Sequence, residues 1–101
     1  MKKILLILLV VTFSSSAFAY PKMELGLGVY NNTAQCGVCH TLQAAGSAGN
    51  IGPNLDKLKP QMPQIIDAVT NGIGVMSPWD GILTYEEIEA VAYYVFNSTN
   101  K

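Results

Sequence analysis

The clearest periodic pattern in the sequence lies near its carboxyl end. Apolar residues fall there at the helical spacing i, i+3, i+4 and i+7, at Ile88, Val91, Ala92 and Val95. Thr84 and Glu87 stand three residues apart just before this run, which is the pattern of a capping box. The pattern predicts an α-helix that begins after Thr84 and turns one apolar face toward a core.

A second helix is predicted in the middle of the chain. Pro63 suits the first turn of a helix, and the pair Asn71-Gly72 suits its end. Between them an apolar stripe is formed by Ile65, Ile66 and Val69. We expect a short helix that buries this stripe.

A first helix is predicted to start at Pro21. Leu25 and Val29 share a face there with Gly26 and Tyr30, and the pattern frays near Asn31-Asn32. Residues 45–55 and 72–81 are rich in glycine and proline, which predicts loops. Because no alternating, β-branched run of strand length occurs, the fold class is predicted to be all-α, with three main short helices and long loops.

Residues 1–19 have the pattern of a secretory signal. Lys2 and Lys3 precede the apolar run 4–13, and the triplet Ala17-Phe18-Ala19 has small residues where a signal peptidase reads them. The apolar run is shorter than the roughly 20 residues of a membrane-spanning helix. We therefore expect cleavage before Tyr20, a domain over 20–101, export to the periplasm and no permanent membrane anchor.

Charge and size narrow the function of this domain. Loss of the two signal lysines takes the formal net charge from −1 to −3, and the chain contains no arginine. A surface with so few positive charges does not bind the phosphate backbone of a nucleic acid, so nucleic acid is not an expected partner. A domain of this size has a marginal apolar core, and we expect a bound cofactor to stabilise it.

The string Cys36-Gly37-Val38-Cys39-His40 supplies the candidate chemistry. In the pattern C-x-x-C-H two thiols add to the vinyl groups of a haem and the histidine binds its iron. A dithiol redox centre has the same Cys-x-x-Cys spacing but follows a strand, and nothing upstream of Cys36 is a predicted strand. A structural zinc site needs four N or S ligands, and these residues offer three. We expect one covalently bound haem c, attached at Cys36 and Cys39, with His40 as an iron ligand.

The second iron ligand is predicted to be a methionine. His40 is the single histidine, which leaves Met23, Met62 and Met76 as candidates after Met1. Met23 lies in the first predicted helix, where packing is its expected role, and Met62 precedes a helix start. Met76 lies in the loop 72–81, whose glycines permit close approach to a flat ligand. The loop context favours Met76 as the second iron ligand. The alternatives are Met62 as the ligand, or an iron whose second position is open.

Taken together, these segments resemble class I c-type cytochromes, which are small and contain one haem. The segments are Gly26 and Tyr30, the string 36–40, the run 51–55, the Met76 loop and the closing helix. The resemblance implies a cytochrome c fold, with helices and loops wrapped around the haem. It further implies that the Pro53 carbonyl accepts a hydrogen bond from the His40 ring. Gly26 would let the first helix cross the last one closely, with Tyr30 and Tyr93 or Tyr94 at the contact.

The sequence departs from the family pattern at the proposed ligand loop. Ser77 separates Met76 from Pro78, whereas the family commonly has methionine followed directly by proline. That dipeptide occurs here at Met62-Pro63, but Met76 has the family's position between the second and last helices.

The resemblance implies a one-electron carrier, not an enzyme, in an extracytoplasmic electron-transport chain. Its expected partners are redox proteins: a dehydrogenase or membrane complex as donor, and an oxidase or reductase as acceptor. The continuation Thr41-Leu42 and the run Leu58-Lys59-Pro60 resemble cytochromes that accompany sulfite dehydrogenases or feed terminal oxidases. One alternative is therefore a subunit bound tightly to an exported dehydrogenase, and another is a haem enzyme with an open iron. As a carrier, the protein is expected to be a monomer that forms small, transient complexes.

Overall fold

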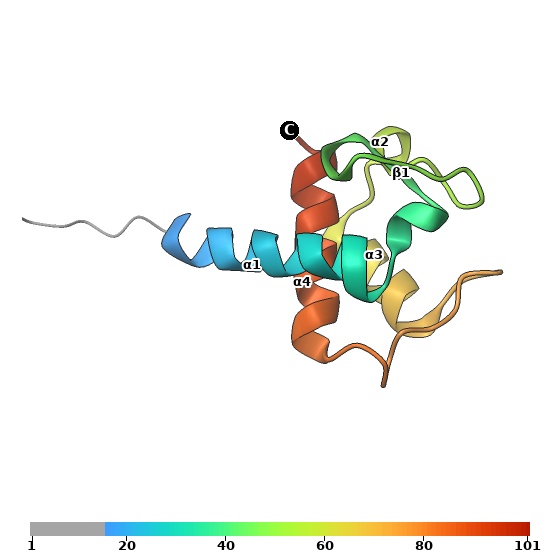
Figure 1. The fold of residues 1–101 in the computed structure, drawn as a ribbon. Coiled ribbons are helices and arrows are strands. Elements are labelled where there is room, and N and C mark those ends of the chain that lie inside the picture. Colours follow the sequence, from blue (N-terminus) through green and yellow to red (C-terminus); the bar gives the residue numbers. More distant parts are fainter. Residues whose placement is uncertain (1–15) are drawn as a thin grey trace, which may run out of the picture.

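Four α-helices form the frame of the structure, a computed structural model that describes residues 16–101 (Figure 1). They are α1 (Ser16–Gly28), α2 (Leu55–Leu58), α3 (Met62–Asn71) and α4 (Tyr85–Thr99). Two strands of two residues each, β1 (Thr41–Leu42) and β2 (Ser47–Ala48), pair antiparallel, with Thr41 opposite Ala48 and Leu42 opposite Ser47. The all-α class predicted from the sequence is confirmed. This small hairpin was not predicted, because a pair so short leaves no alternating pattern in the sequence.

Helix α4 has the start and the buried face that its sequence predicts. The Thr84 hydroxyl accepts a hydrogen bond from the Glu87 N–H at 3.1 Å, and the Glu87 carboxylate accepts one from the Thr84 N–H at 2.9 Å. This reciprocal cap satisfies donors that a helix start leaves unpaired. All four residues of the predicted apolar stripe are buried.

Helix α3 also agrees with its prediction. It begins one residue before Pro63, ends at Asn71, and is closed by Gly72 at φ 73°. Ile65 and Val69 are buried, and Ile66 is half-buried. The one-turn helix α2 was missed; the Asn54 side chain caps it by accepting a hydrogen bond from the Lys57 N–H at 3.3 Å.

The first helix differs from its prediction at both ends. It begins at Ser16, so that Pro21 lies inside it and not at its start. Pro21 removes one N–H from the helix, but Ala17 and Ala19 before it favour a helix strongly and extend it upstream. The helix does not fray at Asn31; its end widens into a π-helical turn over Val29–Thr33.

Residues 1–15 lie outside the described part, and with them most of the predicted signal segment. Within residues 16–101 no helix is both long enough and apolar enough to cross a membrane.

Helices α1 and α4 cross in close contact, as the family resemblance implied (Figure 1). A Cβ on Gly26 would lie 2.2 Å from the Ala90 carbonyl oxygen and 2.6 Å from the Tyr94 Cβ. The rings of Tyr30 and Tyr94 pack beside this crossing, with their centroids 6.0 Å apart and tilted by 57°. Of the two tyrosines that the sequence left open, Tyr94 is therefore the one that contacts Tyr30.

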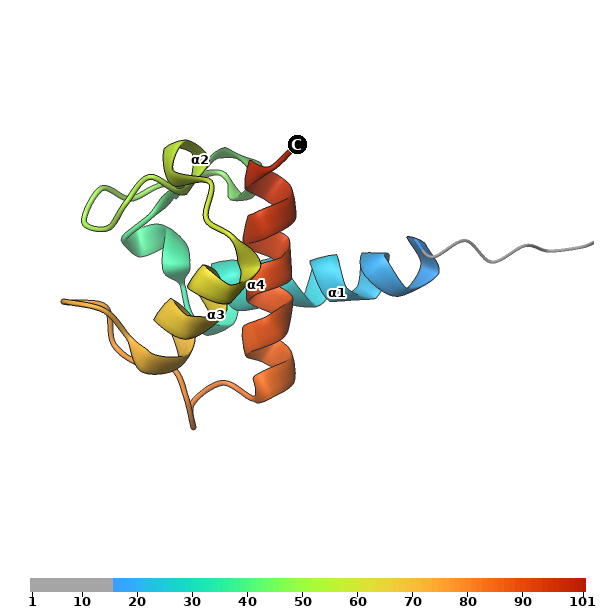
Figure 2. The same ribbon diagram turned by 180° about the vertical axis from the view of Figure 1, so that it is seen from behind.

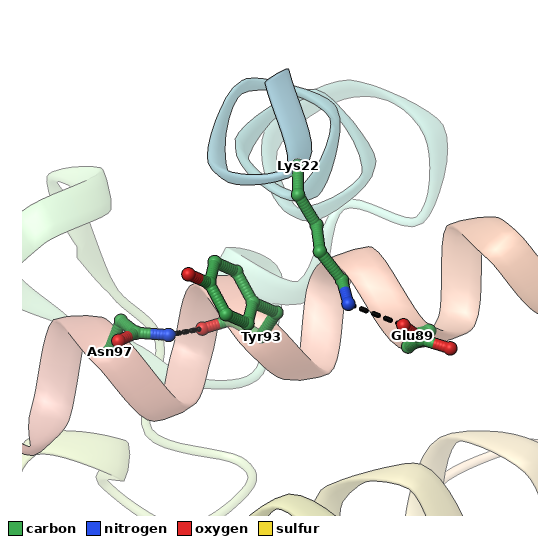
Figure 3. Close-up of polar contacts among 4 residues, drawn as sticks. All are labelled: Lys22, Glu89, Tyr93 and Asn97. Atoms are coloured by element: carbon green, nitrogen blue, oxygen red, sulfur yellow. Dashed lines mark hydrogen bonds and ion pairs between the residues drawn. The ribbon is translucent and has the colours of Figure 1, made fainter. Parts of the chain in front are cut away.

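Tyr93 contacts α1 at a different residue, Lys22 (Figure 3). The Lys22 ammonium group lies 4.9 Å from the centre of the Tyr93 ring and pairs with the Glu89 carboxylate. Tyr93 and Tyr94 thus both contact α1, Tyr93 at Lys22 and Tyr94 at Gly26. Because the Lys22 and Glu89 side chains are about one-third exposed, we expect this ion pair to contribute less than about 1 kcal/mol.

The core is formed by buried side chains of the π-helical turn, β1, α3 and α4, and the two long loops project from it. The largest fully buried side chains are those of Tyr30, Leu42, Val29 and Val91. The loop 72–81 and the turn that carries residues 36–40 both lie on the side of α4 away from the start of α1 (Figure 1, Figure 2).

Candidate functional site

The two cysteines and the histidine of the C-x-x-C-H string lie on one tight turn. The turn Cys36–Val38 is a 3-10 helix that Gln35 enters in a left-handed conformation, with φ 51°. The Cys36 carbonyl accepts the N–H groups of both Cys39, at 3.2 Å, and His40, at 3.0 Å. Both thiols are free. The backbone thus presents two sulfurs and one imidazole from a single turn.

The imidazole of His40 is oriented by the loop opposite. Its Nδ1 lies 2.8 Å from the Pro53 carbonyl oxygen. A carbonyl only accepts hydrogen bonds, so Nδ1 is the donor, and in the neutral ring this tautomer leaves a free lone pair on Nε2. This confirms the hydrogen bond that the family resemblance implied, and it leaves Nε2 as the atom able to bind a metal.

Glycine is required where the loop 46–53 packs against this turn. A Cβ on Gly52 would lie 2.6 Å from the His40 Cε1, and one on Gly49 would lie 2.6 Å from backbone atoms of residues 37–39. The Gly52 N–H also donates to the Cys39 carbonyl at 2.7 Å. Gly49 and Gly52 therefore permit close contact of this loop with the C-x-x-C-H turn.

Sequence reasoning missed Ser47, which joins several parts of the site. Its hydroxyl lies within hydrogen-bonding distance of the His40 carbonyl, the Leu42 N–H and the Tyr30 hydroxyl. Its Cβ also lies 2.6 Å from where a Cβ on Gly37 would be. The only sequence signal was its place among small residues, a pattern that does not specify a partner.

Met76 lies on a hairpin whose backbone is fixed at several points. Its N–H donates to the Ile73 carbonyl at 2.9 Å, and its own carbonyl accepts the Ile73 N–H at 3.1 Å. A Cβ on Gly72 would lie 2.6 Å from that Met76 carbonyl. The Trp79 N–H closes the base of the loop on the Val69 carbonyl of α3, at 2.8 Å. The Met76 side chain is half-buried and packs against the core.

The other two candidate methionines have different surroundings. Met62 lines a groove of about 540 Å³ between α3 and the start of α4, together with Tyr85 and Ile88. Met23 lies on α1 and is half-buried against the core, as its predicted packing role requires. Neither the groove at Met62 nor a shallower one of about 440 Å³ along α1 is lined by residues of the C-x-x-C-H turn.

The residues present fit a covalently bound, flat and largely apolar cofactor. Large apolar side chains are exposed on the segments that carry the site: Val38 at 64%, Ile51 at 67%, Ile73 at 70% and Val75 at 90%. Exposed apolar groups that gather near a site commonly mark a surface that a ligand or partner covers. The donors also fit, because the segment offers two free thiols and an imidazole with Nε2 available.

The Cys36 thiol does not have the acidity of a dithiol redox centre. Burial raises its pKa from 9.0 to about 11, and the negative charge of Cys39 contributes in the same direction. Reactive cysteines of the thioredoxin type have a lowered pKa, which makes the thiolate available. The thiol–disulfide alternative therefore lacks both its structural setting and its acidity here.

Three comparisons with known proteins identify the family of this chain. A model of the family described as cytochrome c oxidase, cbb3-type, subunit III matches residues 21–95. Cytochrome c6 from Tetradesmus obliquus is 33% identical over 87 residues, which cover 76% of this chain and 93% of that protein. Cytochrome c6 from Chlorolobion braunii is 32% identical over 84 residues, covering 73% and 90%. The crystal structure of the c-type cytochrome SorU from Sinorhizobium meliloti superposes with a TM-score of 0.76 at 48% identity, covering 81% of this chain and 95% of that one.

The chain belongs to the cytochrome c family, as a small class I c-type cytochrome with one haem. Its fold is the cytochrome c fold that the sequence resemblance implied. More narrowly, it is an electron-transfer protein similar to cytochrome c6 and to SorU, and it binds one covalently attached haem c with its iron.

Proposed function

We propose that the chain is an exported one-electron carrier in which Cys36 and Cys39 attach the haem and His40 and Met76 bind its iron. The observation that carries this proposal is the hydrogen bond of 2.8 Å between the His40 Nδ1 and the Pro53 carbonyl. It fixes the tautomer that leaves Nε2 free for iron, and it strengthens the imidazole as a ligand. When bound, the haem supplies a one-electron iron couple, while the chain supplies ligands and a dry environment.

Met76 is the proposed second ligand because its backbone is held in place and its loop is open to close approach. Both backbone groups of Met76 are bonded to Ile73, so its side chain starts from a fixed point. Met62 lines a groove with Tyr85 and is partly buried against the core. A neutral thioether opposite an imidazole raises the reduction potential relative to a second imidazole. We therefore propose a carrier of relatively high potential.

The ligand assignment can be tested with three variants of the holo-protein. Met76→Ala should lower the reduction potential and remove the weak sulfur-to-iron absorption of the oxidised protein, whereas Met62→Ala should leave both unchanged. His40→Ala should abolish stable low-spin holo-protein. The assignment of sulfur is wrong if Met62→Ala has the effect expected of Met76→Ala, and recovery of normal low-spin haem in His40→Ala refutes the role of His40.

The second part of the proposal is that the chain is exported to the periplasm and cleaved before Tyr20. Cleavage before Tyr20 would leave Pro21 in the first turn of α1, where its missing N–H costs no hydrogen bond. The mature chain would carry a formal net charge of −3, which favours a redox partner with a basic or apolar docking surface. Mass spectrometry of the protein from its periplasm should give a chain of residues 20–101 plus one haem; an uncleaved chain refutes this part.

A permanent subunit is the competing form of the same activity. The matching family is described by an oxidase subunit, which favours this reading. Such a subunit, for instance of an exported dehydrogenase, would elute with a larger chain when native extract is separated by size. A free carrier elutes alone, near the mass of a monomer. A haem enzyme with an open iron would instead show a high-spin oxidised spectrum that changes when cyanide is added.

A further inference from the structure

The carbonyl oxygen of His40 is held by a side chain from the other arm of the β1–β2 hairpin. The Ser47 Oγ lies 3.0 Å from this oxygen, 3.1 Å from the Leu42 nitrogen and 2.9 Å from the Tyr30 hydroxyl. A serine hydroxyl offers one hydrogen and two lone pairs. These three contacts therefore use its full hydrogen-bonding capacity.

The chemistry of the partners fixes the direction of each hydrogen bond. The Leu42 N–H can only donate, so Ser47 accepts from it. Carbonyl oxygens only accept, and the His40 carbonyl at 3.0 Å is nearer than the Leu42 carbonyl at 3.4 Å, so Ser47 donates to His40. The remaining lone pair of Ser47 then accepts from the Tyr30 hydroxyl. A directed chain runs from Tyr30 through Ser47 to His40.

The far end of this hydrogen-bond chain is anchored in the buried core. Tyr30 is fully buried, and its ring packs against Tyr94 at the crossing of α1 and α4. Its own hydroxyl lies 3.5 Å from the His40 carbonyl, too far for a strong direct bond. Ser47 is thus the group that transmits the position of the helix crossing to the backbone of His40.

Residue His40 is consequently held at three points. Its N–H is bonded to the Cys36 carbonyl, its ring to the Pro53 carbonyl, and its own carbonyl to Ser47. The first two contacts leave the peptide that follows His40 able to rotate. The bond to Ser47 restricts that rotation.

We propose that Ser47, supported by Tyr30, is a positioning residue that sets the orientation of the His40 imidazole toward the iron. The inference rests on the proposed role of His40 as an iron ligand. Ser47 touches neither the iron nor the haem in this account, and it acts only through the backbone of His40.

Proton NMR of the oxidised holo-protein tests this directly. In low-spin ferric haem the shifts of the four ring methyl groups depend on the direction of the axial imidazole plane, and a change of global stability does not by itself move them. Ser47→Ala should change the spacing of these four resonances. Tyr30→Phe, which keeps Ser47 but removes its support, should change the spacing in the same direction by less.

Thr41→Val is the matched control. The Thr41 hydroxyl also spans the hairpin, donating to the Gly49 carbonyl at 2.9 Å, but it does not bond to His40. This variant should lower the midpoint of unfolding while leaving the methyl resonances unchanged. Methyl resonances in Ser47→Ala that equal those of the unchanged protein, or an equal change in Thr41→Val, would overturn the proposal.

The variant Tyr30→Phe keeps the test decisive if Ser47→Ala yields no holo-protein. In that case Tyr30→Phe decides: a changed methyl spacing supports the positioning role and an unchanged one refutes it. Failure of the underlying ligand assignment is recognised separately, because His40→Ala would then retain low-spin haem.

Discussion

Gly26 and Gly28 lie two residues apart in α1, and replacing each by alanine should change stability in opposite directions. A methyl group on Gly26 would lie 2.2 Å from the Ala90 carbonyl oxygen, and Cβ atoms essentially never lie within 3.0 Å of such atoms. The neighbouring atoms are the Ala90 carbonyl group and the Tyr94 Cβ, which cannot rotate away. The two helices must therefore separate at their crossing.

The magnitude follows from two opposing effects. Overpacking of a tight contact costs about 1–3 kcal/mol, and here a backbone obstacle puts the cost at the upper end. Alanine in place of glycine within a helix returns about 1 kcal/mol. Gly26→Ala should thus lower the free energy of unfolding by about 2 kcal/mol. Gly28→Ala, whose methyl meets nothing within 4 Å, should raise it by up to about 1 kcal/mol.

Guanidinium unfolding of the oxidised holo-protein, followed by circular dichroism at neutral pH, measures both values. The slope with denaturant should stay the same in both variants, so that the midpoints alone report stability. Two changes of the same sign, or a Gly26→Ala midpoint equal to that of the unchanged protein, would refute the close crossing of α1 and α4.

Three further outcomes are expected. Gly72→Ala should weaken the proposed Met76–iron bond, because its methyl group would lie 2.6 Å from the Met76 carbonyl oxygen. The weakening should be seen as faster binding of carbon monoxide to the reduced protein. Gly74→Ala, also at positive φ but with open space around it, should leave this rate unchanged. Burial raises the pKa of Tyr30 from 10.0 to about 12, so the folded state keeps a proton that the unfolded chain loses. Stability should therefore fall between pH 10 and about 12, by about 2–3 kcal/mol, and Tyr30→Phe should lack this part of the loss in alkaline unfolding curves. Glu89→Gln should change the free energy of unfolding by less than about 1 kcal/mol, and a larger loss in the same assay would show that its ion pair is not screened by solvent.

The parts of the fold that the sequence predicts are those with local signals. The cap at Thr84 and the stripe from Ile88 to Val95 lie within one helix, so their spacing alone predicts α4. The start of α1 was predicted wrongly because Pro21 is a strong local signal for a helix start, although a helix can continue through it. The adjacent positions Tyr93 and Tyr94 could not be separated from the sequence, and both contact α1, Tyr93 at Lys22 and Tyr94 at Gly26.

The parts of the candidate site that the sequence did not predict depend on contacts between distant backbone segments. Gly49 packs on the peptide groups of residues 37–39, and Ser47 bonds to the His40 carbonyl. Every residue type offers a backbone carbonyl, so a contact with the backbone leaves no recognisable pattern in the sequence. The bond between His40 and Pro53 could be expected only because the family resemblance supplied it.

Backbone contacts, both local and distant, also explain why the arrangement suits a carrier. An electron carrier works best when its ligands keep one geometry in both oxidation states, which requires each ligand to be fixed by its surroundings. His40 is held at its ring by Pro53 and along its backbone by neighbours, while Met76 has both backbone groups bonded to Ile73. The two proposed ligands lie on loops, yet each loop is closed by hydrogen bonds that the chain makes by itself. An enzyme that opens its iron to a substrate would need one ligand to leave the iron, whereas here the hydrogen bond from Trp79 to Val69 holds the base of the Met76 loop against α3.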